Sequence, residues 1–315
     1  MADMRRLLLV LAVLLLWALP GAAGTVPGLV DDSGRRIVVK KPFTRIICLY
    51  PAHTENLYAM GLGHLVIGVP PRQGYPPQAR SKPVFSYRDD PERFLAASPD
   101  LILIRPMIKR GHPALVRALE QAGVTVVSFQ PRTVEQMYQY WLKLGLLTGH
   151  PERARDLVRR FKQGLARIQE RVARVPRDKR PRVFFESIHR HMKTFSPRAI
   201  AIFALTQAGG INLAADARPV RNSNIAAYGK ERILALAERM DVYLAQVGTM
   251  NKITLQDILQ ESGFQALKAV RQGRVYLVDE RIVSRPTPRL LEGIQVIHRL
   301  LYSPPSAPPR AGHSQ

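Results

Sequence analysis

Residues 152–175, in the middle of the chain, read ERARDLVRRFKQGLARIQERVARV. Apolar residues recur in this stretch every three or four positions between charged ones, which predicts one amphipathic helix. About 24 residues would extend roughly 36 Å at the rise of an α-helix. Pro151 suits the first turn of this helix, and Pro176 and Pro181 follow its end. One long helix between two halves of a chain predicts a connector between two lobes.

Short β-type runs alternate with helical patterns on both sides of this helix. The runs are rich in Ile, Val and Leu without clear alternation, as expected for strands that are covered on both faces. The sequence therefore predicts α/β layers around parallel sheets. Strands are expected at 45–49, 65–69, 101–104, 124–129, 183–185, 242–245 and 275–278. Helices are expected at 54–60, 91–97, 113–122, 199–208, 230–238, 255–260 and 289–302, with a helical pattern that starts at 134 and is interrupted at 149–151.

These patterns divide the chain into five parts. The N-terminal lobe is expected at 25–150, the connecting helix at 151–176 and the C-terminal lobe at 177–302. The proline-rich stretch 303–315 is expected to be a disordered tail. Residues 1–24 are expected to be a signal peptide, for the reasons that follow.

The N-terminus has the form of a secretory signal peptide. Arg5 and Arg6 precede an apolar run from Leu7 to Leu19, and small residues follow it. The alternative, a membrane anchor, is disfavoured because the run is short of the ~20 residues that span a bilayer. Cleavage is expected near Ala23 or Gly24, where no cysteine is present to carry a lipid. Export without an anchor predicts a periplasmic location.

The charge of the chain is strongly basic, with 47 Lys and Arg, 24 Asp and Glu and a net charge of +23. These residues are scattered over the whole chain and form no aromatic-basic module, so we expect no nucleic-acid partner. Two interpretations of this charge stay open, a solvated basic surface and attraction to an anionic ligand or membrane face.

The single cysteine, Cys48, excludes an intrachain disulfide. It lies in an apolar segment, which predicts a buried and inert thiol.

Five phrases carry a resemblance to a known family. They are RIICLYPAHTE at 45–55 with GLG at 61–63, PERFLAASPDLIL at 91–103, AGGIN at 208–212, and the segments 263–279 and 288–302. Together they resemble the class III periplasmic binding proteins, which deliver cobalamin, ferric siderophores and haem to ABC importers. The resemblance implies two Rossmann-like lobes with parallel sheets, joined by one long backbone helix, that hold the ligand between them and open only slightly.

The same resemblance implies two permease-docking residues. Members of the family present one glutamate on each lobe to arginines of the membrane permease, and Glu92 and Glu231 stand where these glutamates are expected. Two carboxylates on a rigid frame can form charge-assisted, bidentate contacts with arginine. The alternative is that each is simply an acid in the first turn of a helix, where the helix dipole favours it.

Ligands of open α/β sheets lie beyond the carboxyl ends of the strands, and this rule selects the candidate ligand residues. Tyr87 and Arg88 are added because they directly precede the helix that bears Glu92. The candidate ligand-binding residues are Tyr50, His53, Tyr87, Arg88, Arg105, His189, His191, Met192, Lys193, Met250, Asn251, Arg285 and Arg289.

The side chains in this set indicate two kinds of chemistry. His189, His191 and Met192 are potential ligands of a transition metal, although histidines in a basic loop can equally well hydrogen-bond a ligand or solvent. The arginines suit carboxylate or phosphate groups, and hence an anionic metal chelate. We expect no intrinsic cofactor, and a ligand that contains iron or cobalt.

The expected function is therefore capture of a metal chelate, a ferric siderophore, cobalamin or haem, and its delivery to an ABC permease and ATPase by a monomeric protein. One alternative is binding of a bare transition-metal ion for such an importer. The other is a periplasmic hydrolase, but the chain lacks a Gly-x-Ser-x-Gly elbow, a His-Glu-x-x-His helix and a glycine-rich phosphate loop. No enzymatic activity is expected.

Overall fold

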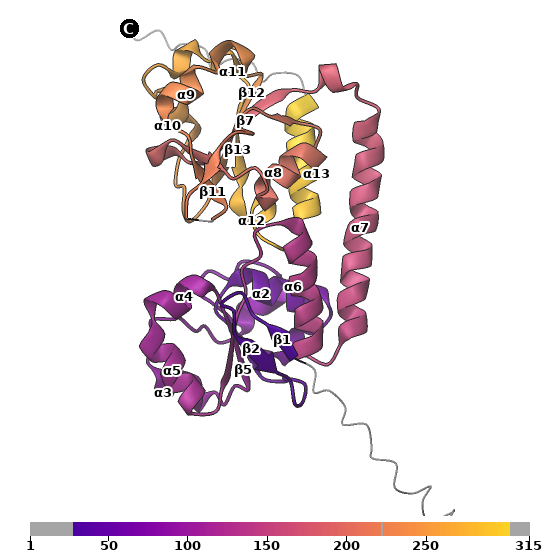
Figure 1. The fold of residues 1–315 in the computed structure, drawn as a ribbon, viewed down its shortest axis with the longest axis vertical. Coiled ribbons are helices and arrows are strands. Elements are labelled where there is room, and N and C mark those ends of the chain that lie inside the picture. Colours follow the sequence, from indigo (N-terminus) through magenta and orange to yellow (C-terminus); the bar gives the residue numbers. More distant parts are fainter. Residues whose placement is uncertain (1–27, 222, 303–315) are drawn as a thin grey trace, which may run out of the picture.

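Two α/β lobes lie one above the other along the long axis of the molecule, and the long helix α7 (Pro151–Ala173) runs beside both of them (Figure 1). The computed structural model describes residues 28–221 and 223–302. The helix lies within the stretch predicted as the connector, and the fold class is confirmed. The predicted signal peptide and the predicted disordered tail lie outside the described residues.

One face of α7 is buried, and its apolar side chains pack against both lobes. Phe161 of α7 lies edge to face with Trp141 of α6 (Val134–Leu147) at a centroid distance of 5.4 Å. Gly164 lets Leu291 of α13 (Leu290–Tyr302) come so close that a Cβ would lie 2.5 Å from Leu291 Cδ1. The helix is thus fixed to each lobe by side-chain packing.

The N-terminal lobe is built on a four-stranded sheet in the order β4-β3-β5-β6, and all of its neighbouring strands are parallel. The predicted strands are confirmed with slightly shorter bounds. The antiparallel hairpin of β1 and β2 was not predicted. The strands are β1 (Gly28–Val30), β2 (Arg36–Val38), β3 (Ile46–Cys48), β4 (Val66–Gly68), β5 (Leu101–Ile104) and β6 (Thr125–Ser128). The helices besides α6 are α2 (Pro51–Ala59), α3 (Pro91–Ala96), α4 (Pro106–Gly111) and α5 (Pro113–Gln121).

The C-terminal lobe has a seven-stranded sheet in the order β10-β11-β8-β7-β12-β13, with β9 paired to β7. Its strands are β7 (Arg182–Ile188), β8 (Lys193–Phe195), β9 (Ile211–Asn212), β10 (Arg218–Pro219), β11 (Ile225–Ala227), β12 (Val242–Val247) and β13 (Val275–Asp279). The core of this sheet is parallel as predicted, from β9 and β7 through β12 to β13, but the sheet continues beyond β7 with β8, β11 and β10, whose pairings are antiparallel. The short 3-10 turn η4 (His189–His191) returns the chain directly from β7 to β8, so no crossover helix intervenes.

The remaining helices of this lobe lie around its sheet. They are α8 (Ile200–Gln207), α9 (Lys230–Leu234), α10 (Leu255–Leu259), α11 (Lys268–Arg271), α12 (Glu280–Val283) and α13. Of these, α9 and α11 lie at the end far from the N-terminal lobe, and α12 lies on the side that faces it (Figure 1). The helix expected at 230–238 is shorter than predicted, because α9 ends at Leu234 and a separate 3-10 turn follows at Ala237–Arg239. Within residues 28–221 and 223–302, no helix has the length and apolar character needed to cross a bilayer.

Candidate ligand site

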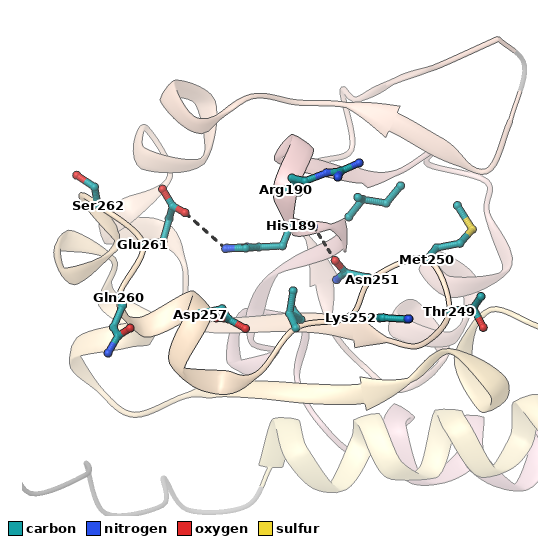
Figure 2. Close-up of a pocket in the computed structure, with 12 residues that line it drawn as sticks. His189, Arg190, Thr249, Met250, Asn251, Lys252, Asp257, Gln260, Glu261 and Ser262 are labelled. Atoms are coloured by element: carbon teal, nitrogen blue, oxygen red, sulfur yellow. Dashed lines mark hydrogen bonds and ion pairs between the residues drawn. The ribbon is translucent and has the colours of Figure 1, made fainter.

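A pocket of about 690 Å³ lies in the C-terminal lobe, where β7 and β12 end (Figure 2). Ile188 at the end of β7 and the η4 residues His189 and Arg190 line it on one side. The loop after β12 supplies residues 249–253, and α10 with the residues after it supplies Asp257, Gln260, Glu261 and Ser262. We call this space the His189 pocket. The strand-end rule thus led to three of its residues, His189, Met250 and Asn251. It missed Asp257 and Glu261, which belong to the helical segment that covers the pocket.

His189 is held between two carboxylates. Its Nδ1 lies 2.9 Å from Glu186 Oε2, and its Nε2 lies 3.5 Å from Glu261 Oε2. Glu186 is fully buried and also accepts a hydrogen bond from the hydroxyl of Tyr243. The hydrogen bond to Glu186 raises the pKa of His189 above its usual value, against the opposing effect of burial. The arrangement therefore favours an imidazolium that directs both of its N–H groups at carboxylates.

Asn251 fixes the loop above this histidine. Its Oδ1 accepts from the backbone N–H of His189 at 2.9 Å, and its Nδ2 donates to the carbonyl of Gln246 at 2.8 Å. Both ends of the Asn251 amide form hydrogen bonds, and the residue is 3% exposed. Its main role is therefore to hold the loop that borders the pocket in place. Met250 beside it is 57% exposed and leaves an apolar side chain available at the pocket edge.

The other candidates from the η4 region point to different partners. His191 is exposed, and its Nε2 lies 3.3 Å from Nη2 of Arg190. Lys193 is the first residue of strand β8. Met192 packs against the core of the C-terminal lobe and has a positive φ of 45°.

Across residues 28–221 and 223–302, no three His, Cys, Asp or Glu side chains gather as a metal site. The proposed metal pair, His189 and His191, therefore has no further protein ligands in the described part of the chain.

Two candidates of the N-terminal lobe, Tyr50 after β3 and Arg105 after β5, lie together at the ends of neighbouring strands. The guanidinium of Arg105 stacks on the ring of Tyr50 at 4.6 Å, and Arg105 Nε donates to Gln130 Oε1 at 3.3 Å. Tyr87 is half-buried against the ring of His112 at 4.8 Å, and Arg88 lies 5.8 Å from the Tyr87 ring. These contacts form flat, positively charged surfaces that suit an anionic or aromatic ligand group.

His53 was predicted to face the ligand, but the structure places it in the core. It is 1% exposed, and its Nε2 lies 3.1 Å from the carbonyl oxygen of Ile104. Because a carbonyl can only accept, Nε2 carries the proton, and Nδ1 accepts from Tyr140 Oη at 2.6 Å. Burial lowers the pKa of His53 to about 3, so the ring is neutral. The strand-end rule chose it wrongly because α2 starts at Pro51 and turns His53 inward.

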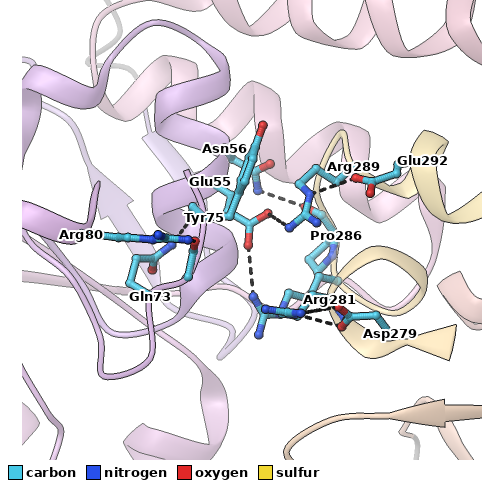
Figure 3. A network of polar contacts seen from close by, with 12 residues as sticks. Glu55, Asn56, Gln73, Tyr75, Arg80, Asp279, Arg281, Pro286, Arg289 and Glu292 are labelled. Atoms are coloured by element: carbon cyan, nitrogen blue, oxygen red, sulfur yellow. Dashed lines mark hydrogen bonds and ion pairs between the residues drawn. The ribbon is translucent and has the colours of Figure 1, made fainter. Parts of the chain in front are cut away.

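Arg285 and Arg289 bind a carboxylate of the opposite lobe, that of Glu55. Figure 3 shows Glu55 and Arg289 facing one another. Arg285 Nη1 lies 3.1 Å from Glu55 Oε1, and Arg289 Nη1 lies 3.8 Å from Glu55 Oε2. Glu55 is 2% exposed, and burial raises its pKa while the two arginines oppose that rise. Tyr75 adds a ring at 4.3 Å from the Arg289 guanidinium. These two arginines, predicted as ligand residues, thus join the lobes to one another, and sequence reasoning missed Glu55 as their partner.

The two predicted docking glutamates have similar settings. Glu92 lies in the first turn of α3, and Glu231 lies in the first turn of α9. Both are exposed, and neither forms an ion pair with any residue in the described ranges. The helices α3 and α9 both lie on the side of the molecule away from α7, one on each lobe (Figure 1).

Two α/β lobes fixed to one long helix, with a pocket at strand ends and a buried polar contact between the lobes, define a two-lobed ligand-binding protein. The model of the family described as "Periplasmic binding protein" matches residues 46–282. The chain belongs to this family, and the resemblance seen in the sequence is confirmed.

Relatives of known annotation or structure cover most of the chain. It is 27% identical over 280 residues to the uncharacterized ABC transporter substrate-binding lipoprotein YvrC of Bacillus subtilis, covering 88% of this chain and 86% of that one. It is 27% identical over 267 residues to the vitamin B12-binding protein of Vibrio cholerae, covering 82% and 90%. A possible iron-binding periplasmic solute-binding protein from Staphylococcus epidermidis superposes with a TM-score of 0.73 at 26% identity, covering 84% of this chain and all of that one.

Proposed function

We propose that this protein is the substrate-binding protein of an ABC importer, and that it captures a metal chelate and delivers it to the membrane permease. The observation that carries the proposal is the family match over residues 46–282. It is supported by two relatives that are described as a substrate-binding lipoprotein and a vitamin B12-binding protein. The cargo is a ferric siderophore, cobalamin or haem, so the ligand brings iron or cobalt.

The charges near the strand ends support an anionic cargo. Arg190 and Lys252 are exposed and line the His189 pocket, while Arg88 and Arg105 lie on aromatic rings of the N-terminal lobe. Arginine forks bind carboxylate and phosphate groups, and ferric siderophores, haem and cobalamin all carry such groups or amides. Exposed Met250 offers an apolar contact for the body of the ligand. We infer that these residues contact the cargo.

Delivery requires a contact with the permease, and we infer that Glu92 and Glu231 make it. One carboxylate on each lobe, held by packing at a fixed separation, gives a geometry that a matching pair of arginines can recognise. On a chain with a net charge of +23, two free acidic points also orient the approach to a partner. The protein acts as a monomer in the periplasm after its signal peptide is removed, with the permease and ATPase as partners.

An uptake assay with a docking variant tests this function. The double variant Glu92→Ala and Glu231→Ala is expected to bind its ligand with native affinity and to lose transport. The matched control is Glu170→Ala with Asp178→Ala. It removes two exposed acids, one of them on α7, that likewise form no ion pair within residues 28–221 and 223–302. Control uptake should equal that of the wild type. Unchanged uptake by the Glu92 and Glu231 variant would overturn the docking assignment.

A further inference from the structure

The two predicted docking glutamates are each followed by an exposed arginine at the same place in a short helix. Glu92 is the second residue of α3 and Glu231 is the second residue of α9, and the third residues are Arg93 and Arg232. The fourth residue of each helix is apolar and 0% exposed, so it anchors this turn to its lobe. We call each glutamate with the arginine after it a docking pair, Glu92–Arg93 on one lobe and Glu231–Arg232 on the other.

The arginine of the N-terminal lobe is fixed by an aromatic ring and a carboxylate. The Arg93 guanidinium lies 5.5 Å from the centre of the Phe85 ring, and Arg93 Nη1 lies 3.2 Å from Asp89 Oδ2. Arg93 Nη2 also donates to the carbonyl of Val84 at 2.9 Å. The ring, the carboxylate and the carbonyl together restrict the side chain to one direction.

The arginine of the C-terminal lobe has the same kinds of partner. The Arg232 guanidinium lies 4.0 Å from the centre of the Tyr228 ring, and Arg232 Nη2 lies 2.5 Å from Asp216 Oδ2. Both docking pairs therefore contain an arginine that is held between an aromatic ring and an acid.

The likeness of the two docking pairs does not follow from the architecture of the lobes. One sheet has four parallel strands and the other has seven strands with antiparallel pairings. Phe85 comes from the stretch between β4 and α3, whereas Tyr228 directly follows β11. Exposed arginine–carboxylate pairs contribute little to stability, so stability alone does not account for the same arrangement on both lobes.

Both guanidinium groups can accept a further partner. The Arg93 side chain is 57% exposed and that of Arg232 is 44% exposed. A guanidinium has five N–H donors, and the hydrogen bonds and ion pairs within residues 28–221 and 223–302 use only Nη1 and Nη2 of Arg93 and Nη2 of Arg232. Adjacent side chains of a helix do not face one another, so neither arginine neutralises the glutamate before it. Each docking pair thus presents one negative and one positive charge.

We propose that Arg93 and Arg232 are further docking residues, and that each binds an acidic side chain of the permease next to the basic group that binds the neighbouring glutamate. The proposal rests on the proposed function, because it takes the docking role of Glu92 and Glu231 as given. The partner surface that fits carries charges of both signs opposite each lobe. Such a pattern fixes the register of docking, because a shift by one group brings like charges together.

Binding to the permease, measured with charge changes of defined sign, tests this proposal. The purified protein is titrated against membrane vesicles that contain the permease and ATPase of its importer, and vesicles without the permease give the background. Arg93→Ala with Arg232→Ala should bind about tenfold more weakly than the wild type. Arg93→Glu with Arg232→Glu should bind more weakly still, because it places a carboxylate opposite each acid of the permease. The melting temperature of each variant checks that it is folded.

The matched control is Arg155→Glu with Arg159→Glu, which changes the net charge by the same amount. Both arginines lie on α7, away from α3 and α9 (Figure 1). Their side chains are 60% and 66% exposed, and each forms an ion pair with an acid of the same helix. The control should bind like the wild type, which separates a local contact from a loss of overall positive charge.

Two results overturn the proposal. One is native binding by the double alanine variant of Arg93 and Arg232. The other is a double glutamate variant that binds as well as the alanine variant or better, since the groups opposite the arginines are then not acidic. If Glu92→Ala with Glu231→Ala loses binding while the arginine variants keep it, this inference alone fails. If none of these variants loses binding, the docking assignment itself fails.

Discussion

Glu55 of α2 and Arg285 of the C-terminal lobe form an ion pair across the lobes, with Oε1 3.1 Å from Nη1. In addition, the Asn56 side chain and the Trp141 indole both donate to the carbonyl of Pro286, at 3.0 and 3.3 Å. The segment that begins at Arg285 is therefore held by charged and neutral contacts from the N-terminal lobe. Together with α7, these contacts link the two lobes.

Removal of one partner of this pair should destabilise the protein strongly. Glu55→Gln leaves two arginines near a buried amide, and loss of one member of a buried ion pair costs about 3–5 kcal/mol. We expect a lower denaturant midpoint and larger motions between the lobes, measured by chemical unfolding and small-angle scattering. The control Glu152→Gln affects an exposed pair with Arg155 and should cost below about 1 kcal/mol. Equal stability of the Glu55 and Glu152 variants would contradict the role of the buried pair.

His53 should make the protein less stable as the pH falls. Its pKa is about 3 in the folded state and near 6.5 when unfolded, so the unfolded state binds the proton first. Stability is fully present above pH ~6.5 and is lost toward pH ~3, with a slope of up to about 1.4 kcal/mol per pH unit. Urea unfolding at several pH values measures this slope, which His53→Gln should reduce.

His189 should affect stability in the opposite direction. Its pKa is raised in the folded state, so it adds stability that is lost as the pH rises through that pKa.

Cys48 should not react while the protein is folded. The thiol is fully buried in β3, and burial raises its pKa to about 12, so almost no thiolate forms at neutral pH. Labelling with a thiol reagent at pH 8 should be negligible without denaturant and complete with it. Rapid labelling of the native protein would show that β3 opens readily.

Gly293 should resist substitution because α13 packs directly on the end of α12. A Cβ at this position would lie 2.1 Å from the carbonyl oxygen of Ile282, which is backbone and cannot rotate away. Gly293→Ala is expected to cost about 1–3 kcal/mol through overpacking, measured by thermal and chemical unfolding. Gly111→Ala is the control, since no atom lies within 4 Å of its Cβ position, and it should leave stability nearly unchanged.

The sequence was sufficient to predict features that depend on local patterns. The long helix followed from spacing at 152–175, and His189, Met250 and Asn251 followed from their positions after strands. Features that depend on a distant partner were missed. Arg285 and Arg289 could not be matched with Glu55 because some 230 residues separate them. The strands β8, with the sequence KTF, and β11, with the sequence IAA, lack the run of Ile, Val and Leu that marked the predicted strands.

We propose that this protein captures a metal chelate without transforming it. The most direct test is a titration of the purified protein with cyanocobalamin, haemin and a ferric hydroxamate, followed by thermal unfolding and absorbance. We expect that one of the three binds saturably, raises the melting temperature with concentration as mass action requires, and is recovered unchanged. If none of the three stabilises the protein, or if the bound chelate is converted to a product, capture of a metal chelate is not the function of this protein.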